Sequence, residues 1–287
     1  MTHPPPRFDP GRRRAVTFAL LLVTALASFE STVVSTALPT IIGDLHGLSL
    51  YSWVFSIYLL TSTISMPVFG RLADLYGRRR ILLVATGLFL AGALVCALAR
   101  SMPQLIAARA LQGLGAGGLM PVALTVTGDL YSIEERAKVQ GLFSGVWGFA
   151  SLIGPLLGAF LTVSFGWRSI FTINLPLGFF AFVLVATQMV ESHEPRRDPI
   201  DLAGAATLAA GVTALLFAVL HRAGPGSLGL PARTGLLLVA GTFLALFARL
   251  QGRREHPLIP PGLFGRVETA APYLSGVLIG TSIYGVD

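Results

Sequence analysis

Two charged residues, Glu30 and Arg109, interrupt long apolar stretches of the sequence. A charged side chain at the centre of a membrane costs about 2.5–3.5 kcal/mol on insertion scales, so each needs a partner or a function. A buried carboxylate can hold either a proton or a cation, which is the exchange that an antiporter requires. Gln112 follows Arg109 by one helical turn and is expected on the same face. The sequence therefore predicts a proton-coupling and substrate-cavity site formed by Glu30, Arg109 and Gln112.

The two charges are also expected at the same depth. Glu30 lies about 22 Å beyond the start of its apolar run at Ala15, at about 1.5 Å per helical residue. Arg109 follows Gln104 on a run of opposite direction, roughly 8 Å from the other face of a ~30 Å core, hence also about 22 Å deep. We expect both side chains to face a common central cavity. An arginine that only knits helices together is the alternative interpretation of Arg109.

The composition indicates which class of protein carries these residues. Of the 287 residues, 53% are apolar and 12% charged, whereas soluble domains carry about 25% charged residues. This balance excludes a disordered chain and disfavours a water-soluble enzyme. The single cysteine, Cys96, lies inside an apolar run, which excludes a disulfide scaffold. The net charge of +7 is scattered between apolar runs, so no nucleic-acid partner is expected. The sequence predicts an all-α polytopic membrane protein.

Apolar runs long enough to cross a bilayer recur along the chain. The predicted spans are Ala15–Ile42, Tyr51–Phe69, Ile81–Ala99, Gln104–Asp129, Val139–Val163, Ser169–Val190, Leu202–Leu220 and Gly235–Leu250. A ninth run begins near Thr269 and continues to the end of the sequence, which indicates a truncated chain. The first run could be a signal peptide, but it continues well past Ala27, so an uncleaved span is expected.

Four segments follow from these spans. We predict a basic tail at 1–14, a six-helix bundle at 15–190, a linker with two extra helices at 191–268 and the start of an incomplete C-terminal bundle at 269–287. Basic residues concentrate in the tail and in every second loop. The opposite loops carry only Arg100, Arg168, Arg222 and Arg233. This asymmetry predicts a cytoplasmic N-terminus in a multi-pass protein of the cell (plasma or inner) membrane.

Recurring proline positions suggest an internal repeat. The second and fifth spans both carry Pro-x-x-Gly, beginning at Pro67 and Pro155, which lie 88 residues apart. The first and fourth spans each have an apolar residue before proline, at Pro39 and Pro121, which lie 82 residues apart. The nearly equal offsets predict two three-helix units, the second inverted, as in transporter halves.

The segment between the second and third spans carries a specific motif. It reads Gly70-Arg71-Leu72-Ala73-Asp74-Leu75-Tyr76-Gly77-Arg78-Arg79-Arg80-Ile81. This segment resembles the loop between helices two and three of the major facilitator superfamily, although Leu75 stands where a basic residue is usual. The resemblance implies a conformational latch between two helix bundles, formed by Gly70, Asp74, Gly77, Arg78 and Arg79. Physically, Asp74 is expected to bind basic neighbours or to face a helix N-terminus.

Two further segments resemble the same family. The stretch from Arg109 to Gly118 is similar to its R-x-x-Q-G-x-G element, which is associated with proton coupling. Gly154, Pro155 and Gly158 resemble the G-P-x-x-G-G antiporter motif, with Ala159 in place of the last glycine. Close helix packing is the alternative interpretation of these residues.

The first-span segment from Glu30 to Pro39 resembles a signature of the 14-helix drug:proton antiporters, with Glu30 in place of Asp and Ser35 in place of Asn. The segment from Trp167 to Gly178 also resembles this subfamily. The resemblance implies a major-facilitator-type bundle of inverted three-helix repeats with an incomplete C-terminal half.

By this resemblance the protein is a secondary active transporter, with proton-coupled efflux of drugs or other amphipathic or cationic compounds. The alternatives are an importer of a sugar or metabolite and a non-transporting membrane sensor or scaffold. The expected partners are the lipid bilayer, a small-molecule substrate and protons, with the proton gradient in place of a cofactor. The five histidines lie in tails or loops without metal-ligand spacing. No enzyme, catalytic residue or metal site is therefore predicted, and no oligomeric state is implied.

Overall fold

The computed structural model describes residues 9–191, 201–220, 229–254, 257–258 and 275. Within these ranges the chain forms helices and no strand. The helices are α1 (Pro10–Leu45), the 3-10 turn η1 (Leu48–Leu50), α2 (Tyr51–Tyr76), α3 (Arg78–Leu98), α4 (Met102–Leu130), α5 (Ile133–Phe165), α6 (Ser169–Thr172), α7 (Asn174–Gln188), α8 (Leu202–Leu220) and α9 (Leu230–Gln251). The predicted ninth span, near Thr269, lies outside the described residues.

The helices match the predicted spans in order and direction along the chain. Among the described residues, seven helical segments are long and apolar enough to cross a membrane by length and composition. The sixth of these, Ser169–Gln188, comprises α6 and α7 in succession. α8 offers a shorter apolar stretch, Ala203–Val219. The predicted all-α polytopic membrane fold is confirmed.

The boundaries of the first three helices differ from the sequence prediction. α1 begins at Pro10, within the predicted basic tail. The segment predicted as a loop after Phe69 is helical: α2 continues to Tyr76, and α3 starts at Arg78. The extension is favourable because Leu75 on this last part of α2 is buried. The turn between α2 and α3 is the single residue Gly77, whose φ of 98° is readily adopted only by glycine.

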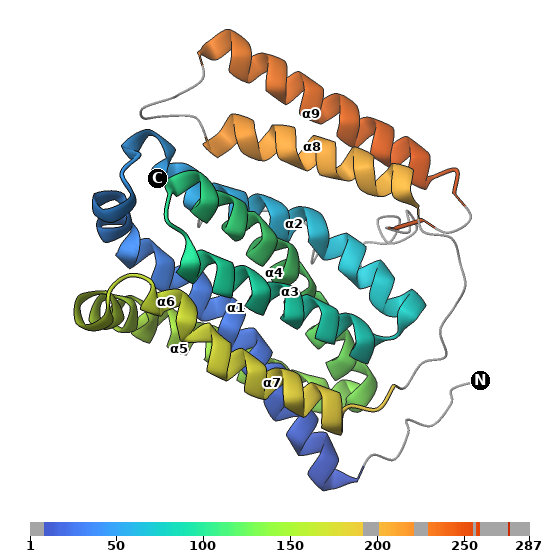
Figure 1. Ribbon diagram of the computed structural model, residues 1–287. Coiled ribbons are helices and arrows are strands. Elements are labelled where there is room, and N and C mark those ends of the chain that lie inside the picture. The colour runs from blue at the N-terminus through green and yellow to red at the C-terminus, as the bar shows by residue number, and fades with distance from the viewer. Residues whose placement is uncertain (1–8, 192–200, 221–228, 255–256, 259–274, 276–287) are drawn as a thin grey trace.

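The six-span bundle contains two groups of helices with matching contacts. α4 packs against α2 and α3, and α1 packs in the same way against α5 and α7 (Figure 1). The first three spans therefore correspond to the last three, with α1 equivalent to α4, α2 to α5 and α3 to α7. This arrangement confirms the inverted three-helix repeats.

Glycines bring the helices of each group into close contact. A Cβ at Gly113 would lie 2.6 Å from the carbonyl oxygen of Tyr58 on α2. A Cβ at Gly158 would lie 2.9 Å from the carbonyl oxygen of Val33 on α1. Side-chain hydroxyls cross the same interfaces, for example from Ser65 to the carbonyl of Leu114 at 3.0 Å. Gly113 and Gly158 therefore permit the short interhelical distances of the bundle.

The α8–α9 pair lies alongside α2, at the edge of the bundle (Figure 1). The rings of Trp53 on α2 and Phe217 on α8 are 5.2 Å apart. At one end of the pair, Asp201 accepts a hydrogen bond from the backbone N–H of Gly204 at 2.9 Å and caps α8. Asp201 also accepts from the Gln251 amide at 2.7 Å, which joins the end of α9 to the start of α8.

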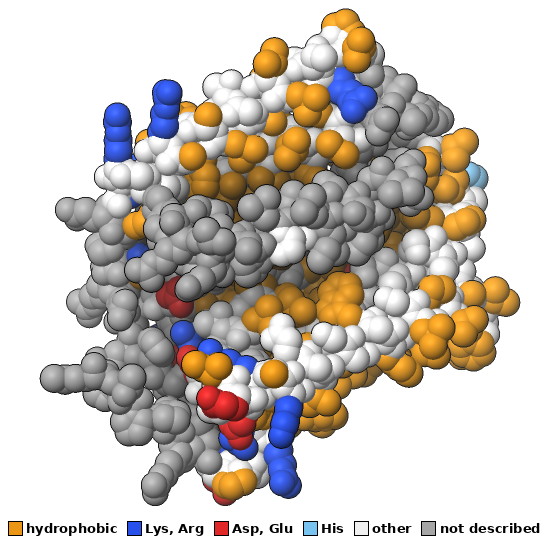
Figure 2. Space-filling model, turned by 180° about the vertical axis from the view of Figure 1, so that it is seen from behind, with side chains coloured by type: hydrophobic (Ala, Val, Ile, Leu, Met, Phe, Trp, Pro, Cys, Tyr) orange, Lys and Arg blue, Asp and Glu red, His pale blue; other side chains and the backbone are white. Residues whose placement is uncertain are grey.

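Apolar side chains cover much of the outer surface. On the face in Figure 2 they spread along the helices, whereas charged side chains gather mainly toward the left-hand end. The exposed apolar side chains include Leu98, Val163 and Leu238, at 67%, 87% and 72% exposure. Such a surface matches the hydrocarbon of a bilayer, which solvates apolar side chains and leaves charges at its borders.

The interior contains two apolar clusters with a polar layer between them. On α1, Val16–Leu26 contributes to the first cluster and Val33–Ile41 to the second. Between these stretches lies Glu30. On α4, Arg109 and Gln112 likewise separate Leu105 and Ala108 of the second cluster from Ala116 of the first.

Candidate functional site

The polar layer is centred on an ion pair between Glu30 of α1 and Arg109 of α4. Arg109 Nη1 donates to Glu30 Oε1. Glu30 is 2% exposed and Arg109 is fully buried. The direct contact places the two charges at the same level of the bundle, and their depth in a membrane stays a prediction. Desolvation of two charges is costly, so such a pair persists only with further hydrogen bonds.

Arg109 makes two further hydrogen bonds and one cation–π contact. Its Nε donates to the carbonyl of Val54 on α2 at 3.2 Å. Its Nη1 also donates to Oε1 of Gln112 at 2.8 Å, so the predicted shared face of these two residues is confirmed. The guanidinium lies over the ring of Tyr58, 4.1 Å from the ring centre. Arg109 thus connects α1, α2 and α4 and is held even when one partner changes.

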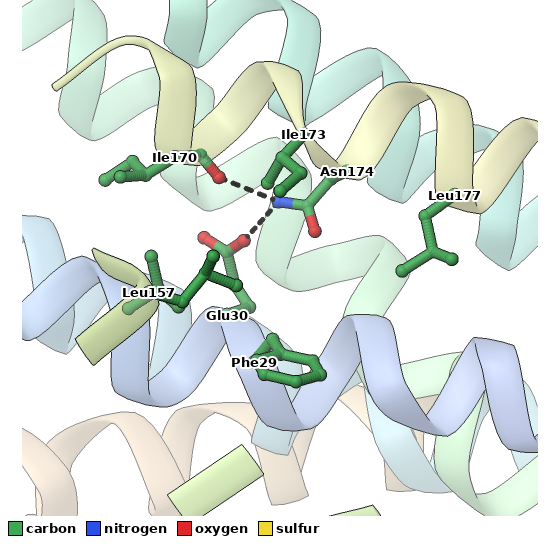
Figure 3. Close-up of a pocket in the computed structure, with 8 residues that line it drawn as sticks. Phe29, Glu30, Leu157, Ile170, Ile173, Asn174 and Leu177 are labelled. Carbon is green, nitrogen blue, oxygen red and sulfur yellow. Dashed lines mark hydrogen bonds between the residues drawn. The ribbon is translucent and has the colours of Figure 1, made fainter. Parts of the chain in front are cut away.

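The second oxygen of Glu30 has a separate partner. Nδ2 of Asn174, at the start of α7, donates to Glu30 Oε2 at 2.8 Å and also approaches the carbonyl of Ile170 at 3.3 Å (Figure 3). Asn174 is 4% exposed. The candidate site in the sequence did not include it, although a polar residue within the sixth apolar run was the available signal. The polar layer therefore consists of Glu30, Arg109, Gln112 and Asn174.

A cavity of about 80 Å³ adjoins Glu30 and Asn174. Figure 3 shows the two side chains pointing toward one another among apolar residues of α1, α5, α6 and α7. The apolar lining consists of Phe29, Val33, Leu157, Ile170, Ile173 and Leu177. The Glu30 carboxylate thus borders a cavity that is otherwise lined mainly by apolar side chains. The predicted central cavity faced by both Glu30 and Arg109 stays a prediction, because the lining of this cavity includes Glu30 and not Arg109.

Two donors of the polar layer have no hydrogen-bond partner among the described residues. These are Nη2 of Arg109 and Nε2 of Gln112, both buried. The sulfhydryl of Cys96 on α3 donates to Gln112 Oε1 at 3.5 Å, which leaves the amide nitrogen as the free end of that side chain. The network therefore has spare donors for an acceptor group, which a fully satisfied structural ion pair would lack.

A second cluster of charges lies at the ends of α2, α3 and α4. Arg78 forms an ion pair with Asp129 of α4 and lies 3.9 Å from the Asp74 carboxylate. The Glu191 carboxylate accepts from the backbone N–H groups of Arg78 and Arg79, at 2.9 and 3.2 Å. Glu191 therefore stabilises the N-terminus of α3.

The structure shows where the predicted latch residues lie, and their role as a latch between bundles stays a prediction. Asp74 contacts its basic neighbour Arg78, as expected, but the helix N-terminus is occupied by Glu191 and not by Asp74. Gly77 forms the turn, and a Cβ there would collide with the Glu191 carboxylate. At Gly70, a Cβ would have no described neighbour within 4 Å.

The residues of the fifth-span motif make helix contacts. Gly154 and Gly158 face Thr32 and Thr36 of α1, and Pro155 lies inside α5. Thr32 Oγ1 also donates to the carbonyl of Ala150 at 3.3 Å. The motif thus forms the α1–α5 interface, which agrees with the packing interpretation.

The described residues contain no group of three or more His, Cys, Asp or Glu side chains that could hold a metal ion.

Comparisons with known proteins extend these observations. The Major Facilitator Superfamily model matches residues 20–280. Multidrug resistance protein 3 of Bacillus subtilis (strain 168) is 35% identical over 269 residues, covering 93% of this chain and 52% of the relative. Efflux pump dotC of Dothistroma septosporum (strain NZE10 / CBS 128990) is 36% identical over 263 residues, covering 87% of this chain and 44% of the relative. The chain spans about half the length of these curated relatives.

A solved structure shares the fold. The proton:xylose symporter XylE, bound to 6-bromo-6-deoxy-D-glucose, superimposes with a TM-score of 0.58 and 16% identity, covering 86% of this chain and 56% of that one. At this identity the likeness concerns the helix arrangement alone.

Proposed function

This chain belongs to the Major Facilitator Superfamily, and on that premise we propose that it acts in proton-coupled efflux of amphipathic or cationic compounds. The observation that carries the proposal is the buried Glu30–Arg109 pair, held by Asn174 and Gln112. The names of the relatives, a multidrug resistance protein and an efflux pump, support export. The protein is a multi-pass membrane protein, and its charge pattern supports a cytoplasmic N-terminus.

The polar layer can exist in two states. With Glu30 ionised, its two oxygens accept from Arg109 and Asn174. When Glu30 takes up a proton it loses its charge, and Arg109 keeps the Val54 carbonyl, Gln112 and the Tyr58 ring. The attraction between α1 and α4 then weakens without leaving the cation unsolvated. Proton exchange at Glu30 would thereby alter contacts among α1, α4 and α7.

This change is the kind that coupling needs. A ligand shifts a conformational equilibrium only through a difference in its free energy of interaction with the two states. A proton on Glu30 has such a difference, because only the ionised carboxylate attracts Arg109 strongly. At the other end, the contacts of Arg78 with Asp129 and Asp74 offer a second ionic network that can be made and broken. The driving energy in this scheme is the proton gradient.

The test uses energised everted membrane vesicles that contain the full-length gene product. A panel of lipophilic cations is added, and proton release is recorded for the wild type, Glu30→Gln and Glu134→Gln. Glu134 is an exposed carboxylate at the start of α5 and serves as the matched control. Release in the wild type and the control, with loss in Glu30→Gln, supports the proposal. Release that persists in Glu30→Gln moves the coupling site elsewhere, and no release with any compound favours a carrier of sugars or metabolites.

A further inference from the structure

The contact between Asn174 and Glu30 has a counterpart in the other half of the repeat. The spacing of 82 residues that relates Pro39 to Pro121 also relates Glu30 to Gln112 and Gly92 to Asn174. In the structure, Gly92 of α3 lies against Gln112, because a Cβ at Gly92 would be 2.5 Å from the Gln112 Cα. The α3–α4 and α7–α1 contacts are therefore equivalent by sequence spacing and by geometry.

The two equivalent contacts differ in chemistry. At Gly92, the backbones of α3 and α4 approach closely, and no side chain intervenes. At the equivalent position on α7, the Asn174 amide stands between the helices and binds Glu30 Oε2 at 2.8 Å, beside the cavity of about 80 Å³. If Asn174 only filled space, a glycine with directly packed helices could take its place, as Gly92 does in the other half of the repeat. We therefore infer that the Asn174 amide is present to bind the Glu30 carboxylate.

We propose that Asn174 is a positioning residue for proton exchange at Glu30: its amide holds the ionised carboxylate in place and sets the pH at which Glu30 takes up its proton. A neutral donor that binds the charged form favours that form, so loss of the donor favours protonation. This role rests on the proposed function, because it requires Glu30 to be the coupling carboxylate.

Other charged and titratable groups around Glu30 also affect its protonation. Arg109 of α4 is in direct contact with Glu30. The Arg109 guanidinium lies 4.1 Å from the ring centre of Tyr58 on α2, and Cys96 of α3 donates to Gln112, another partner of Arg109. α5 contributes the apolar Leu157 to the same surroundings. Substitution of Asn174 changes none of these groups, so a change in the pH profile is attributable to the amide.

Two substitutions separate positioning from packing. Asn174→Ala removes the donor, and Asn174→Asp keeps nearly the same shape but replaces the donor with a second acid beside Glu30. A purely structural asparagine would tolerate the aspartate better than the alanine. A positioning role predicts instead that Asn174→Asp shifts the pH profile more than Asn174→Ala does, because adjacent carboxyl groups resist simultaneous ionisation. Thr187→Ala is the matched control on α7, since its exposed hydroxyl binds only its own helix, at the Val183 carbonyl.

The experiment records cation-dependent proton release from everted vesicles across a range of pH, using the full-length gene product. Relative to the wild type, the half-maximal pH is expected to rise by about one unit in Asn174→Ala, as loss of a hydrogen bond to a charged group predicts. It is expected to rise further in Asn174→Asp and to stay unchanged in Thr187→Ala.

A second measurement applies even if a variant no longer transports. In purified protein that remains monodisperse in detergent, the infrared carboxyl band that disappears in Glu30→Gln reports protonation directly, and it should show the same shifts. Absence of wild-type proton release with every cation contradicts the proposed function. Wild-type release together with unchanged pH profiles and infrared titrations in both Asn174 variants overturns the role of Asn174.

Discussion

Substitution of Gly113 by alanine tests a close contact between α2 and α4. The added Cβ would lie 2.6 Å from the carbonyl oxygen and 3.1 Å from the Cα of Tyr58, and it would overlap the Thr61 hydroxyl. The hydroxyl can rotate away, but the Tyr58 backbone is part of a helix and cannot. α4 must therefore move away from α2. Arg109, one turn earlier on α4, would then be drawn from the Val54 carbonyl and the Tyr58 ring.

The expected cost follows from overpacking of a well-packed interior, which is about 1–3 kcal/mol. The matched control is Gly87→Ala on α3, where an added Cβ has no described neighbour within 4 Å. That substitution should stabilise the protein by about 0.5–1 kcal/mol, through the higher helix propensity of alanine. The two substitutions should thus change the free energy of unfolding in opposite directions, and the two variants should differ by about 1.5–4 kcal/mol.

The assay is reversible denaturation of purified protein in mixed micelles, followed by circular dichroism. A third variant, Gly113→Ala combined with Thr61→Ala, removes the clash with the Thr61 hydroxyl and leaves the clash with the Tyr58 backbone. It should recover little of the lost stability, because the clash with the Tyr58 carbonyl remains. The reasoning is refuted if Gly113→Ala and Gly87→Ala have the same unfolding free energy, or if removal of the Thr61 hydroxyl restores the wild-type value.

Two further predictions concern the charged groups. Arg109→Gln alone should destabilise the protein by about 3–5 kcal/mol because it leaves a buried carboxylate without its ion-pair partner, and addition of Glu30→Gln should restore most of this in a double-mutant cycle of unfolding free energies; additive costs would argue against a buried pair. Glu191→Ala removes the acceptor of two backbone N–H groups at the start of α3. It should cost about 1–2 kcal/mol locally, measured as roughly tenfold faster amide hydrogen exchange at Arg78 and Arg79, and unchanged exchange there would exclude Glu191 as the cap.

The sequence predicts the helices well because the bilayer imposes their length and polarity. Each described span coincides with an apolar run. The meeting of Glu30 and Arg109 could be predicted because it requires only the helical rise and the direction of each span. The ends of the helices were predicted less well than their positions in the sequence. α2 passes its predicted end at Phe69 because Ala73 and Leu75 beyond it are buried. Such burial depends on neighbouring helices, which local hydropathy does not contain.

The missed residues share one property, which is that their roles arise from contacts between distant segments. Asn174 binds Glu30 across 144 residues of sequence, and Glu191 binds Arg78 across 113. The sequence prediction offered the helix N-terminus as one of two alternatives for Asp74, whereas the structure supplies Glu191 from beyond the end of α7. For Asn174, the repeat spacing carried some long-range information, since it relates Asn174 to Gly92.

The ion pair that joins α1 to α4 also constrains how the protein is made. Glu30 is synthesised 79 residues before Arg109. At about 5–20 residues per second, the carboxylate waits roughly 4–16 s for its partner. A lone charge at the centre of a span costs about 2.5–3.5 kcal/mol to release into lipid. We therefore expect α1 to remain beside the insertion machinery until α4 arrives, so that the first four spans leave it together.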